Sequence, residues 1–356
     1  MDDPDILKCL DDALAERRKP ARIDIDSMTG NLKALVVPFK QRADSVVRRV
    51  NASLFPRQRC NAQIFFCEEP GYGAFAMSAQ HDFIVLNIGL IPTLTDFFQR
   101  MMATTGLWPD FGKHELLGAS EGYRAQEGHR AHMLWNVLPV RAPTDLLRTA
   151  LATVFMSECF DLIVRHELAH LVLGHLKDDA RAIRADPIAT HALEFAADGH
   201  AAIWGLEPLG DMPRKLGSRS GALDEAYQEF HRSPDDAFVN YLLANFFIFR
   251  LMDDTDWSNH TFANRSHPPG PMRFHGACIH LIDYFKQNGD SDGETRVLRT
   301  MQNIWELGEQ IFAKTFGVEP NPDIKRLTLS ELSEEHYNQM SDKARTLPPH
   351  LFGLAG

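Results

Sequence analysis

The chain has 356 residues, enough for about two average domains or for one elaborated domain. Its composition, with 44% hydrophobic, 24% charged and 10% aromatic residues, excludes a disordered or collagen-like chain. With 37 Lys and Arg against 48 Asp and Glu, the formal net charge is −11 and no basic block stands out, so nucleic acid is not expected as a partner.

Several features bear on where the protein works. The five cysteines have unrelated spacings and form no C-x-x-C pair, which is typical of reduced thiols. The amino end is acidic and no apolar segment follows it, unlike a secretory signal. The longest apolar stretch, Tyr241 to Met252, is short and contains Asn245 and Arg250, so no membrane span is expected. The sequence therefore predicts a soluble, cytoplasmic protein.

The first third of the chain is predicted to hold a helical segment and a small sheet. Residues 1–55 have helical patterns interrupted at Lys19-Pro20. Short apolar or alternating runs at 62–69, 72–79 and 81–88 are typical of strands. Residues 106–143 are polar and rich in Gly and His, which indicates a long insertion loop.

The rest of the chain is predicted to be helical. A long apolar helix is expected from an N-cap at Thr144 to about Gly174. Further helices are expected over 188–204, 234–251, 272–287 and 294–316, followed by a polar helical tail at 321–356. The predicted fold class is α+β, mostly helical, with residues 56–320 as the main domain between the two terminal segments.

The most informative segment is His166-Glu167-Leu168-Ala169-His170, an H-E-x-x-H pattern inside the long apolar helix. Side chains four positions apart share one face of a helix, so both imidazoles can point at one Zn²⁺ ion. Glu167 lies one step round that face, where its carboxylate can accept a proton from a metal-activated water. The alternative is a solvated polar face, but polar groups in so apolar a helix need a buried partner, which favours the metal.

A third ligand must come from elsewhere, because Leu173 and Leu176 stand where the metzincin extension needs Gly and His. Downstream, Glu194 and Asp198 are four positions apart on an apolar predicted helix. One of them can bind zinc while the other accepts the N–H of a ligand histidine. A surface charge pair is the alternative. Other candidate ligands, each also explained by a structural role, are His175, His191 and His200.

A third motif is Ser266-His267-Pro268-Pro269-Gly270-Pro271-Met272-Arg273. Proline-rich turns commonly do no more than start helices. Near a zinc site, however, His267 and Arg273 could stabilise the oxyanion that develops during attack on a carbonyl group.

These three motifs resemble those of a known group of enzymes. The order H-E-x-x-H, E-x-x-A-D-x-x-A and [ST]-H-P-x-x-x-x-R is similar to gluzincin metallopeptidases of the HtpX and prenyl-protein-processing type, which are commonly embedded in membranes. The chain is more similar to the Lit-type phage-exclusion peptidases, in H-E-x-x-H-x-x-x-x-H from His166 to His175, in the short gap to the E-x-x-x-D pair and in the later Ser-His-Pro. The resemblance covers roughly residues 60–290.

The resemblance implies a zincin-like fold and a role for each motif residue. It implies zinc ligands at His166, His170 and Glu194, a general base at Glu167, an outer partner at Asp198, and supporting residues at His267 and Arg273. The Lit type is associated with cutting a host translation elongation factor and blocking phage growth. By analogy, the resemblance implies a translation factor as partner and a role in phage defence or a stress response.

Together these observations predict a zinc endopeptidase with one zinc ion per chain; manganese and cobalt are the alternative metals. We expect the substrate to pair with an exposed strand at about 82–88, with a contact region of Phe83, Ile84, Val85 and Leu86. The 106–143 insertion is either a lid or a linker. Two rival classes stay open: a regulatory or binding protein whose zinc is structural and whose Glu167 is idle, and an aminopeptidase, for which no amine-binding motif is identifiable.

Overall fold

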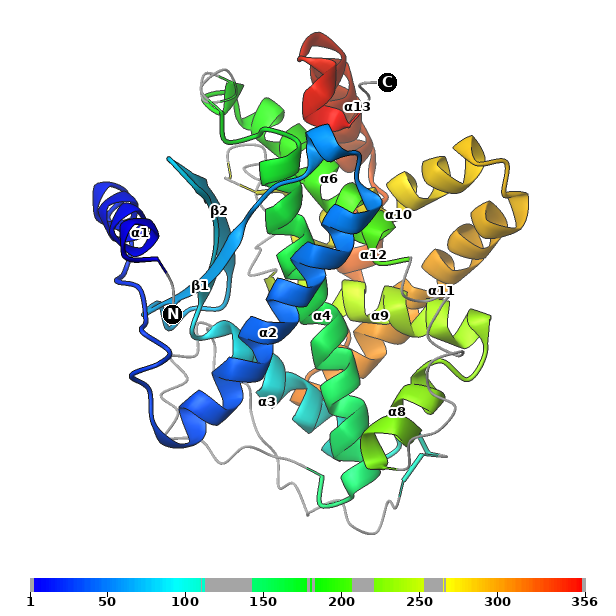
Figure 1. Cartoon of the computed structure of the whole chain (residues 1–356). Helices are drawn as coiled ribbons and strands as arrows, with labels where there is room; N and C mark the ends of the chain where they lie inside the picture. Colours follow the sequence, from blue (N-terminus) through cyan, green and yellow to red (C-terminus); the bar gives the residue numbers. More distant parts are fainter. Residues whose placement is uncertain are drawn as a thin grey trace.

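Long helices pack on one face of a small sheet in the computed structural model, which is mostly helical as the predicted α+β class requires (Figure 1). The structure describes residues 3–109, 111–112, 143–177, 180, 183–206, 221–252, 265 and 267–353. The helices are α1 (Pro4–Glu16), α2 (Gly30–Ser53), η1 (Pro56–Gln58), α3 (Leu90–Ala103), α4 (Leu146–Val172), α6 (Pro187–Trp204), α8 (Ala222–Phe230), α9 (Pro234–Met252), α10 (Gly270–Gln287), α11 (Ser291–Phe316), α12 (Asp323–Thr328), α13 (Glu331–Thr346) and η4 (Pro349–Phe352).

The sheet contains β1 (Gln63–Cys67), β2 (Ala74–Ser78) and β3 (Asp82–Asn87), in the order β1-β3-β2. β3 pairs parallel to β1 and antiparallel to β2. Successive side chains of a strand point to opposite faces. Ile84 and Leu86 therefore join the main helical core, whereas Phe83 and Val85 pack on the other face in a cluster with α1. Helix α1 thus covers the side of the sheet that faces away from the long helices.

The expectation that residues 82–88 form an exposed substrate-binding strand is wrong. β3 is the middle strand, so both of its edges are already paired. The proposed contact region, Phe83, Ile84, Val85 and Leu86, is fully buried. An uninterrupted apolar run is typical of a strand covered on both faces, and β3 is covered in this way by the helical core and by α1.

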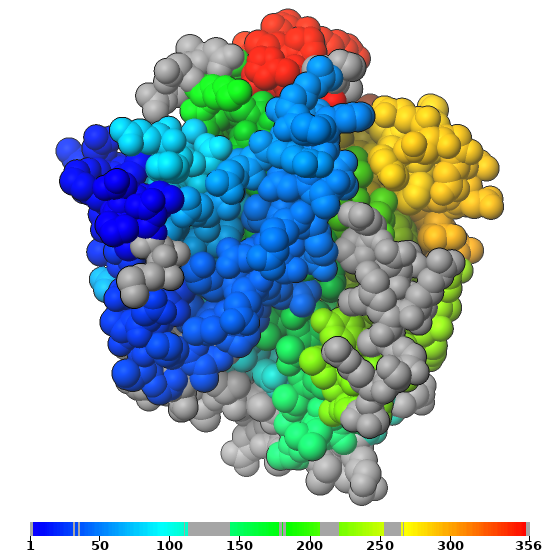
Figure 2. All heavy atoms as spheres, in the orientation of Figure 1, coloured from blue at the N-terminus to red at the C-terminus, as the bar shows by residue number. Residues whose placement is uncertain are grey.

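Helix α4 is the central helix of the fold. It starts with Asp145 as its N-cap, whose carboxylate accepts a hydrogen bond from the Arg148 backbone N–H at 3.0 Å. The N-cap is therefore one residue later than the predicted Thr144. Helix α4 is buried on nearly all faces because α2, α3, α6, α8 and α9 pack around it. In Figure 2, α2 lies diagonally across one face of the molecule, over α4.

Small residues let helix α6 approach its neighbours closely. Ala196 and Ala197 pack against Ala169 of α4 in one buried cluster. Towards α10, a Cβ atom added at Gly199 would lie 2.3 Å from the His280 ring. Helix α6 therefore packs closely on α4 through Ala196 and Ala197, and Gly199 serves the contact with α10.

The two terminal segments pack onto the main core. Helix α2 contributes Val36, Val46 and Val50 to the same buried cluster as α4. At the other end, α13 and η4 contact α6. The predicted insertion at 106–143 lies outside the described residues except for 106–109, 111–112 and 143. Within the part of the chain that the structure describes, no helix is long and apolar enough to cross a membrane.

We predict that Gly199→Ala destabilises the protein by roughly 1–3 kcal/mol, because α6 and α10 must move apart to admit a methyl group at a filled position. Urea unfolding measures the change. Gly276→Ala is the matched control, since it lies in the same helix pair and its Cβ atom would meet the Phe195 ring at 3.3 Å, a contact that needs only a small shift. A Gly199→Ala variant at least as stable as Gly276→Ala would contradict the close packing.

Candidate metal centre

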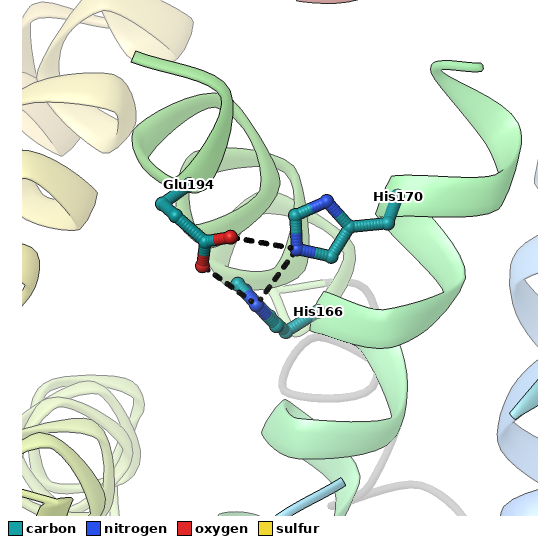
Figure 3. Close-up of side chains that lie close together, drawn as sticks. All are labelled: His166, His170 and Glu194. Atoms are coloured by element: carbon teal, nitrogen blue, oxygen red, sulfur yellow. Dashed lines mark hydrogen bonds and ion pairs between the residues drawn. The ribbon is translucent and has the colours of Figure 1, made fainter. Parts of the chain in front are cut away.

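Three buried side chains from two helices converge at one point. His166 and His170 project from α4, one helical turn apart, and Glu194 projects from α6 (Figure 3). The two Nε2 atoms are 3.1 Å apart. The Glu194 carboxylate oxygens lie 3.4 Å from His166 Nε2 and 3.5 Å from His170 Nε2. Among the described residues, this is the group of three whose ligand atoms lie close enough to share a metal ion.

The distances fit a tetrahedral zinc site. With zinc bonds of about 2.0–2.1 Å, neighbouring ligand atoms are separated by about 3.3 Å, close to the three observed separations. Glu194 Oε2 is buried and accepts no hydrogen bond from the described residues. A buried carboxylate oxygen without a donor needs an explanation, and a cation between the three groups provides one. Two imidazoles and one carboxylate are donors that suit zinc.

The charges around the site also favour a cation. Burial alone would lower the pKa of His166, but the Asp198 and Glu194 carboxylates raise it to about 10. Burial alone would raise the pKa of Glu194, but the surrounding histidines lower it well below its usual range. Without a metal ion, a proton on His166 therefore supplies the positive charge.

Asp198 contacts the Nδ1 atom of His166, and Arg273 in turn binds Asp198. Asp198 Oδ1 lies 2.8 Å from His166 Nδ1, which is the contact expected of a carboxylate that accepts the N–H of a ligand histidine. The Arg273 guanidinium donates from Nε and Nη2 to the two oxygens of Asp198, each at 2.8 Å. Arg273 Nη2 is also 3.6 Å from Glu194 Oε2. The arginine therefore fixes the carboxylate that orients His166.

One of these three side chains, His166, lines an open cleft of about 760 Å³. Glu167, His267 and Arg273 line this cleft together with His166. His267 is half-exposed, and its Nε2 atom lies 3.6 Å from Glu194 Oε2. Ser266, the first residue of that motif, lies outside the described residues. The structure thus brings residues of all three sequence motifs to the lining of this cleft.

The other candidate ligands point elsewhere. His175 has its nitrogens 2.8 Å from His170 Nδ1 and 2.7 Å from the Leu351 carbonyl oxygen. His191 is similarly engaged, with His336 and the Arg265 carbonyl oxygen. His200 directs Nε2 towards the Phe352 carbonyl oxygen, at 3.4 Å. In this arrangement none of these three histidines is available as a ligand.

Two parts of the site were not identified from the sequence. The first is the contact between His175 and the ligand His170, which Gly174 could have indicated, because a glycine after a helix commonly turns the chain back. The second is the cleft wall formed by Tyr72, Gly73 and Ala74 at the start of β2. That wall could be identified only once β2 was known to be an outer strand of the sheet, and no local sequence pattern shows the strand order.

Comparisons with models of protein families, with curated proteins and with solved structures found no match to this chain.

We predict that zinc binding at about pH 8 displaces the proton held by His166, whose raised pKa keeps it charged below about pH 10. Zinc affinity should therefore rise with pH over this range. Calorimetry in two buffers of different ionisation enthalpy counts the protons released. Asp198→Asn removes the main cause of the raised pKa, so it should release fewer protons, by up to about one. Equal release from both proteins would contradict the electrostatic account.

Proposed function

We propose that the protein is a zinc-dependent endopeptidase of the gluzincin type with a zincin-like catalytic site. One observation carries the proposal: three ligand atoms converge on one point, and His166 of this group lines an open cleft together with Glu167. Catalytic zinc sites have three protein ligands and leave one position for water or substrate, whereas structural sites are closed by a fourth protein ligand.

The residues around the cleft have separate tasks in peptide hydrolysis. A bound zinc ion would supply a Lewis acid and lower the pKa of a coordinated water. Glu167 accepts a proton from the attacking water and delivers it to the leaving nitrogen. Arg273 and Asp198 keep His166 oriented, as their hydrogen bonds require. His267, at the open side, is placed to donate a hydrogen bond to the oxygen of the attacked carbonyl.

Strand β2 replaces β3 as the proposed substrate-binding strand. In the described part of the sheet β2 is an edge strand, and its first residue, Ala74, lines the cleft. The Asn87 N–H donates to the Gly73 carbonyl, so the antiparallel alternation directs the backbone groups of Ala74 and Ala76 away from β3. An extended peptide can add to that edge by main-chain hydrogen bonds.

An aminopeptidase would need an anionic group to hold the free amine of its substrate. Among the described residues that line the cleft, the carboxylates are Glu167 and Asp198. Asp198 is already bound by Arg273 and His166, and Glu167 is required as the base. This distribution of charge favours an endopeptidase.

We expect the purified protein to contain about one zinc ion per chain and to lose it when His166 or Glu194 is changed to Ala, because each change removes one of three ligands. Elemental analysis measures the content. His231→Ala is the control, since it removes a buried histidine that follows α8 and not a proposed ligand. Retention of tightly bound zinc by Glu194→Ala would show that the third ligand is elsewhere.

Glu167→Gln should keep zinc and fold but lower peptide cleavage by roughly 100- to 10,000-fold, because the amide cannot accept the proton. Mass spectrometry of new termini, with a proteome-derived peptide mixture and an intact translation elongation factor as substrates, measures the activity. The factor is included because of the resemblance to the Lit-type peptidases. If the zinc-loaded wild type cleaves none of these substrates and Glu167→Gln changes neither zinc content nor stability, the result would instead support the alternative hypothesis of a regulatory protein with a structural zinc ion.

A further inference from the structure

The carboxyl-terminal segment packs directly on the helices that carry the three proposed metal ligands. Helix α13 contacts α6, and η4 lies against the same helix (Figure 1). Leu351 of η4 is fully buried with Ala180 and with Leu193, the residue before Glu194. Residues far apart in the sequence therefore meet next to the metal ligands.

The end of helix α4 brings His175 back onto His170. Gly174 has a φ of +75°, a left-handed conformation that glycine adopts without strain. The His175 backbone N–H donates to the His170 carbonyl at 2.9 Å, and the Gly174 N–H donates to the Leu171 carbonyl at 3.1 Å. These two bonds form a Schellman motif. The turn places His175 Nδ1 2.8 Å from His170 Nδ1, with both rings buried.

The acceptor at the far end sets the direction of the hydrogen bonds. The Leu351 carbonyl oxygen can only accept, so His175 Nε2, at 2.7 Å, carries a hydrogen and donates. A neutral His175 then has a lone pair on Nδ1, and His170 Nδ1–H donates to it. His170 Nε2 is left with its lone pair, directed at Glu194 and His166. This is the tautomer that a metal ligand needs.

We infer that His175 and the Leu351 carbonyl are positioning groups that hold His170 in its metal-binding tautomer. Through Leu351, the carboxyl-terminal segment therefore increases the affinity of the site for the metal ion. The inference rests on the metal-binding half of the proposed function and does not depend on which peptide is cut. Partners of this kind orient the ligands of metal sites, and their loss commonly lowers metal affinity by about 10- to 100-fold.

A second histidine pair forms a contact between the carboxyl-terminal segment and the helix that carries Glu194. His336 of α13 lies 2.9 Å from His191, which is three residues before Glu194 on α6. His191 in turn lies 2.8 Å from the Arg265 carbonyl oxygen, two residues before His267. The segment therefore supports both helices that supply ligands.

His200 provides a matched control. Like His175, it directs Nε2 at a carbonyl of η4, that of Phe352, at 3.4 Å. His200 also contacts the Trp204 ring and interacts electrostatically with His280, and neither of these is a proposed ligand. Replacing it removes a histidine contact with the same segment and leaves the ligand His170 untouched.

The test measures zinc affinity by competition with a fluorescent chelator, using full-length wild type, His175→Leu, His175→Gln and His200→Leu. His175→Leu should weaken binding by about 10- to 100-fold. His175→Gln should restore most of the affinity, since its amide can accept from His170 and donate to Leu351. His200→Leu should stay within about twofold of wild type, because it touches no proposed ligand. Circular dichroism with a chelator present verifies that each variant is folded.

Equal affinity of folded His175→Leu and wild type would overturn the inference, as would no recovery in His175→Gln. A second measurement does not need a variant that folds: long-range ¹⁵N–¹H correlation spectra of wild type report which ring nitrogen is protonated. We expect hydrogen on Nε2 of His175 and not on Nδ1; the reverse would overturn the inference. Failure of peptide cleavage alone would count against the proposed function and would leave these outcomes unchanged.

Discussion

The structure depends on one electrostatic constraint: a carboxylate and two imidazoles are buried together between α4 and α6. Removing a charged group from water costs several kcal/mol unless it is paired. The three ligand atoms face one another, and acceptors alone cannot satisfy each other. Either the proton that the raised pKa of His166 retains or a metal ion can satisfy all three groups. The polar side chains around the three groups, Asp198, Arg273 and His175, orient them or balance their charge.

Polar contacts connect the proposed ligands to other elements of the fold. His166 is held by Asp198, and Asp198 by Arg273 at the start of α10. His170 contacts His175, and His175 contacts the Leu351 carbonyl. Ring orientation is thus determined by a second helix on one side and by the chain end on the other. A ligand whose outer nitrogen is held in this way has only its inner nitrogen available for the metal ion.

The parts of the site that follow a helical period were predictable from the sequence. The spacing of His166 and His170, and of Glu194 and Asp198, specifies shared helix faces, because the helical period is local. The strand order was not predictable in this way: residues 82–88 have the same apolar pattern whichever strands flank them, and the middle position of β3 depends on pairing with β1 and β2. The Leu351 contact was also out of reach, since it joins residues 176 positions apart.

The contact between the chain end and His170 has a thermodynamic consequence in both directions. If docking of the segment around Leu351 increases zinc affinity by a given factor, zinc must strengthen that docking by the same factor, because the coupling between two binding equilibria is reciprocal. A tenfold effect corresponds to about 1.4 kcal/mol. The segment contacts α6 through α13 and η4, and α6 carries Glu194. Loss of the metal ion would therefore loosen the chain end and α6 together, and displacement of the chain end would weaken the hold on the metal ion at His170.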